Sequence, residues 1–226
     1  MVMISYPHKF VFLKTHKTGG TSFEMLLEPW CTPPGHVVRE RVPEMVTDYG
    51  IVGARLNRGP QKPYWRNHAS AKQVVAHLGE AFWDEYKRII SVRNPYRRAI
   101  SQFYWQTTWK KLTLPDSVDE QRVMFSDFVL SDSFKSDYYI THADGRYVAT
   151  HMFRLEHRDE DIIKVGEALG IPLRPEDLPK TKENSDRKPD ADFRTFFSKK
   201  EEDAVRDKQG WVFEHCGYDE SSAAAF

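Results

Sequence analysis

Residues 10–27 read FVFLKTHKTGGTSFEMLL, a stretch that predicts a strand, a glycine-containing loop and a helix in immediate succession. The continuous apolar run at 10–13 is typical of a short strand buried on both faces of a sheet. A helix is predicted over 21–27, and Pro29 stops it soon afterwards. The glycines allow a tight turn and a close approach to a ligand, and the helix start offers unpaired N–H groups. This arrangement favours a bound phosphate.

The lysine of this loop stands on the unusual side of its glycines. Lys17 precedes Gly19 and Gly20, whereas the nucleotide-triphosphatase pattern G-x-x-x-x-G-K-[ST] places its lysine after them. The dinucleotide fingerprint G-x-G-x-x-G is absent as well. The absence of both motifs therefore disfavours ATP hydrolysis and NAD-dependent chemistry as functions of this chain. A plain turn before a helix remains the alternative interpretation of the two glycines.

The rest of the chain alternates strands with helices. Ser70 and Asn94 are predicted helix caps, the second followed by Pro95 at the first helical position. Ser198 and Glu201 form a capping pattern before the last helix. Strands are predicted at 88–92 and 151–155; helices at 72–78, 81–86, 95–110, 118–130, 159–169 and from 198 to about 216; a short helix at 43–49 within an irregular stretch, 32–66; and a loop at 172–195. This alternation predicts an α/β fold with a central, mainly parallel sheet flanked by helices.

Length and composition indicate one globular domain, residues 1–226, of ordinary size or with a small subdomain. Lysines plus arginines number 33 and so do the acids, so the chain as a whole is not built to bind nucleic acid. No apolar stretch is long enough to span a bilayer, and we expect no membrane partner. The two cysteines, Cys31 and Cys216, show neither metal-ligand spacing nor a disulfide framework.

A second candidate anion site follows the predicted strand 88–92. Arg93 stands at the carboxyl end of that strand, where ligands of open α/β sheets collect, and Ser101 lies two helical turns further on. The planar guanidinium suits phosphate. Alternatively, Arg93 pairs with a carboxylate and Ser101 is a small helix-packing residue.

Taken together, the segments KTHKTGGTS and RIISVRNPYRRAIS resemble sulfotransferases that use 3′-phosphoadenosine 5′-phosphosulfate (PAPS). The chain is most similar to the bacterial and Golgi carbohydrate group, which includes the chondroitin and heparan sulfate O-sulfotransferases. Three more segments, NHASAKQVVAHLG, SDYYITHADGRYVATHMFRLEHRDED and HCGYD, resemble the same group. The likeness extends over nearly the whole chain.

The resemblance implies a three-layer P-loop-like fold and a role for each matching residue. It places the 3′-phosphate on Arg93 and Ser101. It also implies a nucleotide-covering loop near Lys182 and Arg187, although a solvated run of charges is the favoured interpretation of these two residues. The family needs no metal ion, so none is expected here. The 5′-phosphosulfate loop falls on Lys17, Thr18, Gly19, Gly20, Thr21 and Ser22.

The implied reaction is the in-line transfer of a sulfuryl group from PAPS to an acceptor hydroxyl. A base must remove the proton of that hydroxyl, and a histidine suits this task near neutral pH. His68 is the first candidate because it lies in a polar stretch before a helix, where related sequences also carry a histidine. It could instead be a surface or capping residue. His16 adjoins the loop and could point away, and the carboxylates Glu24 and Asp137 are weaker candidates. His77 fits a structural role.

The expected acceptor is a carbohydrate or a small hydroxyl compound. Trp105 and Trp109, in a cluster otherwise typical of helix core, could face an acceptor ring. Basic residues of the irregular stretch could bind an acidic glycan or simply provide solubility; they are Arg39, Arg41, Arg55, Arg58, Lys62 and Arg66.

We therefore expect a PAPS-dependent sulfotransferase, in a bacterial cytoplasmic form. A P-loop kinase or NTPase is a second possibility, which the missing Walker lysine disfavours. A non-catalytic nucleotide- or glycan-binding module on the same fold is a third, disfavoured because binding alone does not need Lys17.

Overall fold

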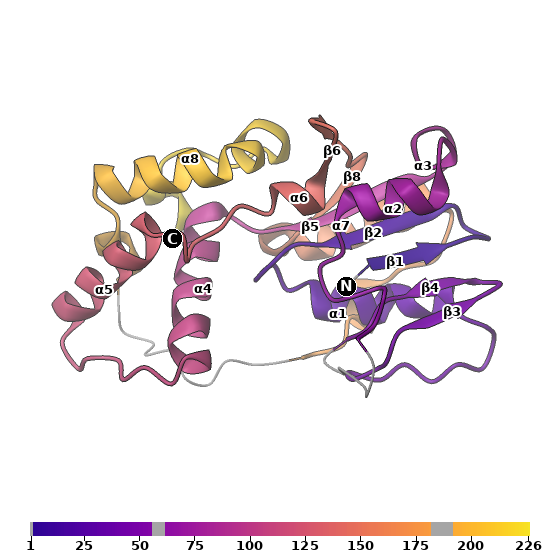
Figure 1. The fold of residues 1–226 in the computed structure, drawn as a ribbon, viewed down its shortest axis with the longest axis horizontal. Helices are drawn as coiled ribbons and strands as arrows, with labels where there is room; N and C mark the ends of the chain where they lie inside the picture. The colour runs from indigo at the N-terminus through magenta and orange to yellow at the C-terminus, as the bar shows by residue number, and fades with distance from the viewer. Residues whose placement is uncertain (1, 56–61, 182–191) are drawn as a thin grey trace. The chain divides into compact units, whose positions relative to one another are not determined.

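The computed structural model of the chain describes residues 2–55, 62–181 and 192–226. They form two compact units (Figure 1). The first comprises Met1–Val92 and Tyr138–Lys182. The second comprises Arg93–Asp137 and Glu183–Phe226.

The first unit is built on a six-stranded mixed sheet of order β3-β4-β1-β2-β5-β8. Its strands are β1 (Val2–Ser5), β2 (Phe10–Lys14), β3 (Met45–Thr47), β4 (Gly50–Val52), β5 (Lys87–Val92) and β8 (His151–Arg154). β2, β5 and β8 are mutually parallel, whereas β1, β3 and β4 join through antiparallel pairs. The α/β class and the central sheet flanked by helices are thus confirmed.

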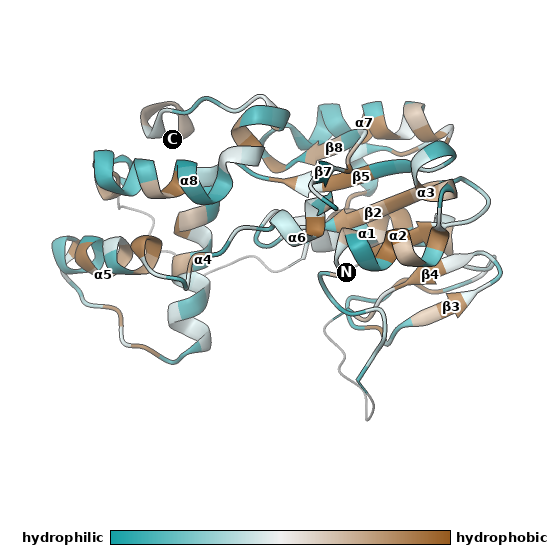
Figure 2. Cartoon of the chain, turned by 45° about the horizontal axis from the view of Figure 1, so that its top comes forward, coloured by the Kyte–Doolittle hydropathy of each residue, from teal (hydrophilic) through white to brown (hydrophobic). Residues whose placement is uncertain are grey.

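Helices cover both faces of this sheet. Phe12 and Ile89, which pair across β2 and β5, share one apolar cluster with Phe23 of α1 and Ile162 of α7. The residues that alternate with them along the strands, such as Leu13, point to the opposite face, which α2 covers (Figure 1). Figure 2 shows the strands mostly in the hydrophobic colour, as expected for a sheet covered on both faces. The helices of this unit are α1 (Gly20–Leu27), α2 (Ala71–Leu78), α3 (Ala81–Asp84), α6 (Tyr138–Thr141) and α7 (Arg158–Leu169), with the short turns η1 (Glu28–Cys31), η2 (Leu155–His157) and η3 (Pro175–Asp177) and the hairpin β6 (His142–Ala143) and β7 (Arg146–Tyr147).

The antiparallel part of the sheet corrects one sequence expectation. The helix predicted at 43–49 is wrong, because the chain forms the β3–β4 hairpin there and β4 pairs with β1. A side chain at Gly50 would place its Cβ 2.0 Å from the carbonyl oxygen of Ile4, so this close pairing requires glycine. Short strands of this kind are stabilised by their partners, and sequence periodicity alone did not reveal them.

The second unit is helical and has its own aromatic core. It contains α4 (Pro95–Trp109), α5 (Val118–Leu130), α8 (Lys199–Cys216), η4 (Phe193–Phe196) and η5 (Ser222–Ala225). The predicted caps are present: the Asn94 side chain accepts hydrogen bonds at the start of α4, and Ser198 with Glu201 forms a capping box. Phe103, Phe125 and Phe196 pack edge to face at the centre of the unit.

Candidate functional site

The loop between β2 and α1 turns through two residues in the left-handed region of the backbone. Lys17 adopts φ 63° and Gly19 φ 70°, both in the left-handed region. Gly19 is the N-cap residue of α1 and provides no side chain to the first N–H groups of that helix. The positive end of α1 is therefore suited to a negatively charged ligand.

A buried hydroxyl network fixes this loop to the neighbouring strand. The Thr18 hydroxyl lies 2.7 Å from Ser91 Oγ and donates to the carbonyl oxygen of Thr15 at 3.1 Å. The Thr15 N–H donates to Ser91 Oγ at 3.3 Å. Thr18 was expected to bind phosphate, but its hydroxyl is already hydrogen-bonded to the carbonyl oxygen of Thr15 and to Ser91 Oγ, which fits a structural role for this side chain.

An ion pair lies beneath the loop. Lys14 Nζ donates to Glu24 Oε2 at 2.8 Å, and both side chains are buried. Burial, the largest single effect, raises the pKa of Glu24, but the Lys14 ammonium and other positive charges outweigh it and lower the pKa overall. A general base needs a pKa near the working pH. Glu24 is therefore better explained as a structural partner of Lys14 than as the candidate base.

Gly20 is closely packed against Lys14, and its replacement by alanine is expected to destabilise the first unit. The new Cβ would lie 2.6 Å from Lys14 Cγ and 2.7 Å from Lys14 Cδ. Lys14 cannot swing away without breaking its bond to Glu24, so we expect a loss of about 1–3 kcal/mol. The matched control is Gly210→Ala in α8, where a Cβ meets nothing within 4 Å and helix propensity predicts a gain of about 0.5–1 kcal/mol. Urea denaturation checks both signs; equal effects would contradict the contact argument.

His68 lies beside the loop. Its Nδ1 is 2.9 Å from the carbonyl oxygen of Lys14, and its ring stacks on His16, with centroids 3.7 Å apart and planes at 19°. Because a carbonyl oxygen only accepts, Nδ1 carries the hydrogen and the neutral ring has its lone pair on Nε2. Burial and then nearby positive charges, including that of His16, hold the pKa of His68 well below its ordinary value. His16 therefore points toward the candidate base.

A hydroxyl from a distant part of the chain also contacts the loop helix. Ser22 Oγ lies 2.8 Å from Thr181 Oγ1, across 159 positions of sequence. No local pattern in the sequence marks Thr181. Thr15 and Ser91 were missed as well, although both are polar residues at the carboxyl ends of neighbouring parallel strands, a position that would have identified them.

The predicted 3′-phosphate residues belong to the second unit. Arg93 directly precedes Asn94, the cap of α4, and is partly buried. Ser101 lies within α4 and is buried. Asp137, a weaker base candidate, is buried against Arg98 at 2.9 Å, which fits a structural ion pair better than a base.

Several other candidates are placed differently from expectation. Trp105 and Trp109 are exposed and stack on one another with centroids 5.9 Å apart, so they are not helix core. Arg55 is fully buried and binds Glu28 at 2.5 Å, which removes it from the basic surface. Lys182, Arg187 and Arg58 lie outside the described residues.

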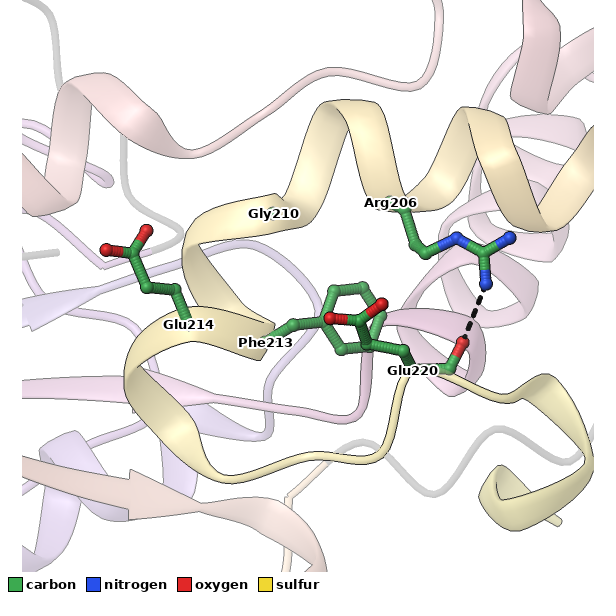
Figure 3. Close-up of a pocket in the computed structure, with 5 residues that line it drawn as sticks. All are labelled: Arg206, Gly210, Phe213, Glu214 and Glu220. Carbon is green, nitrogen blue, oxygen red and sulfur yellow. Dashed lines mark hydrogen bonds between the residues drawn. The ribbon is translucent and has the colours of Figure 1, made fainter.

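A separate pocket of about 340 Å³ lies in the second unit (Figure 3). Arg206 Nη1 donates to the carbonyl oxygen of Glu220 at its edge, at 3.2 Å. The lining residues are Arg206, Gly210, Phe213, Glu214 and Glu220. None of them is a site residue predicted from the sequence.

Over residues 2–55, 62–181 and 192–226, no helix combines the length and apolar character needed to cross a bilayer. The same residues contain no group of three or more His, Cys, Asp or Glu side chains arranged to hold a metal ion. Comparison with protein-family models, with curated proteins and with solved structures found no match.

Proposed function

We propose that the protein is a sulfotransferase with a three-layer P-loop-like fold, which moves a sulfuryl group from PAPS to a carbohydrate hydroxyl. The observation that carries the proposal is the placement of His68 against the β2–α1 loop. A left-handed lysine and a helix N-terminus supply the anion site, and a neutral imidazole contacts the same loop. An anion cradle with a base beside it suits group transfer to a hydroxyl better than binding alone.

Each part of the loop has a distinct task in this proposal. The backbone N–H groups of Gly19–Ser22 hold the 5′-phosphate at the positive end of α1. The hydroxyls of Thr21 and Ser22 add donors, with Ser22 oriented by Thr181. Lys17 neutralises the charge that develops on the leaving phosphate oxygen. The assignment of Arg93 and Ser101 to the 3′-phosphate rests on the sequence resemblance.

The transfer balances as a direct in-line displacement. The acceptor oxygen forms a bond to sulfur while the bond from sulfur to the 5′-phosphate oxygen breaks, and that oxygen leaves with the electron pair. His68 takes the acceptor proton on Nε2, because Nδ1 is committed to the carbonyl oxygen of Lys14. The protein thus supplies position, charge and one proton-accepting group.

Thermal unfolding with adenosine 3′,5′-bisphosphate tests the donor class. At about 100 times its Kd, a ligand that binds only the folded state adds about 2.7 kcal/mol. For a chain of this size that corresponds to a rise in Tm of roughly 5–10 °C. We expect this rise with the bisphosphate and a much smaller one with adenosine 5′-monophosphate, which lacks the 3′-phosphate. Stabilisation by ATP–magnesium alone would favour the kinase or NTPase alternative.

A further inference from the structure

The stacking of His16 on His68 has no role in the proposed transfer step itself. His16 lies between Thr15 and Thr18, the two threonines that anchor the loop to Ser91. It is thus held by a rigid stretch of backbone. Its ring lies almost parallel to that of His68, with centroids 3.7 Å apart. The two residues are separated by more than fifty positions in sequence, so the contact is tertiary.

His68 needs such a contact if its direction is to be fixed. It adopts φ 64°, a conformation that few non-glycine residues hold without support from their surroundings. The hydrogen bond from Nδ1 to the carbonyl oxygen of Lys14 fixes one atom of the ring, but it still allows the ring to turn about that bond. A flat ring stacked on the imidazole face removes this rotation, and so fixes the direction in which Nε2 points.

We propose that His16 is a positioning residue for His68, which holds the imidazole plane so that Nε2 faces the acceptor hydroxyl. The inference rests on the proposed role of His68 as the base. His16 itself does not touch the reacting atoms in this proposal. It acts through the orientation of its neighbour, and a flat side chain without a titratable group can replace it.

His16 also affects the protonation of His68. Burial is the largest cause of the lowered pKa of His68, and the positive charges of His16 and Lys14 also oppose a proton on its ring. The Lys14 ammonium is balanced by Glu24. Replacing His16 therefore removes one of these opposing charges, and the pKa of His68 should rise in every variant that lacks His16.

Nuclear magnetic resonance of the histidine rings tests the positioning role without any substrate. In the native protein we expect a His68 signal with the hydrogen on Nδ1. His16→Phe keeps a stacking ring, so this tautomer should persist while the pKa of His68 rises. His16→Ala removes the stack, so the His68 ring should turn about its hydrogen bond: its ring-proton signals should broaden and lose their fixed nuclear Overhauser contacts, while the hydrogen stays on Nδ1. His8→Ala is the matched control, because His8 also contacts an aromatic ring, Trp30, but lies in the turn at the opposite end of β2.

Turnover supplies the second measurement. Misdirecting a base costs roughly 10- to 100-fold in kcat, and we expect this loss in His16→Ala with a donor KM close to native. His16→Phe should recover most of it. Unchanged line widths and nuclear Overhauser contacts of the His68 ring protons in His16→Ala would overturn the positioning role, whatever the activity. If the native protein transfers no sulfuryl group to any acceptor of a glycan panel, the proposed function fails, and the ring spectra still decide whether His16 orients His68.

Discussion

Replacing Lys17 by alanine is expected to lower the rate of sulfuryl transfer by about 10²- to 10³-fold, the usual effect of removing one group that stabilises transition-state charge. In the proposed mechanism, the ammonium of Lys17 faces charge that grows on the 5′-phosphate oxygen only as the bond to sulfur breaks. Its loss should therefore appear mainly in kcat. Binding of adenosine 3′,5′-bisphosphate should persist, because the backbone N–H groups of the loop are unchanged.

The chain offers a closely matched control for this substitution. Lys9 is also a lysine with positive φ, at 49°, and it lies in the turn before β2 instead of the loop after it. Lys9→Ala therefore carries a similar backbone cost and the same loss of charge, at the opposite end of the same strand. Single-turnover transfer and calorimetric titration of the bisphosphate measure the two effects. Retained turnover in Lys17→Ala would remove Lys17 from the mechanism.

Replacing His68 by alanine should lower kcat by about 10²- to 10⁴-fold, the range in which general bases contribute. The acceptor hydroxyl then loses the Nε2 lone pair that removes its proton. His77→Ala is the control, because His77 is an exposed histidine of the following helix whose Nε2 lies 3.1 Å from the Tyr6 hydroxyl. An equal loss in both variants would point to a general effect on the fold.

The pH profile of kcat/KM provides a sharper test of the same residue. Only the neutral imidazole accepts a proton, so activity should fall on the acid side as His68 becomes charged. Because burial and neighbouring charges lower the pKa of His68 in the free protein, this acid limb should lie below 6.5. A bound polyanion favours the imidazolium, so the limb for kcat should lie at higher pH than that for kcat/KM. The limb should be absent in His68→Ala.

Protein stability should follow from the same lowered pKa, with a definite sign. Below pH 6.5 the unfolded chain takes up a proton at His68 while the folded protein resists it. The contribution of neutral His68 to the free energy of unfolding is thus fully present above pH 6.5. It is lost as the pH falls toward the pKa of His68 in the folded protein. Urea denaturation of native protein and His68→Ala across this range isolates the contribution, which should be smaller in the variant.

Many elements of the fold could be predicted from local signals. Asn94 and Pro95 marked the start of α4, and Gly170 marked the end of α7, because caps and left-handed residues have short-range causes. The β2–loop–α1 unit was predictable for the same reason. The β3–β4 hairpin was not, since its strands have only three residues each and are stabilised by pairing with each other and with β1.

For the candidate site, the sequence by itself determined the glycine turn, the position of its lysine and the helix behind it, because glycines and helix ends act over a few residues. Only the tertiary structure decided which side chains surround that loop. It placed Ser91 beneath Thr18, Thr181 beside Ser22, and the ring of His16 against His68. These contacts join residues that are far apart in the chain. They arise from strand pairing and packing in the folded unit, whose distances no local pattern encodes.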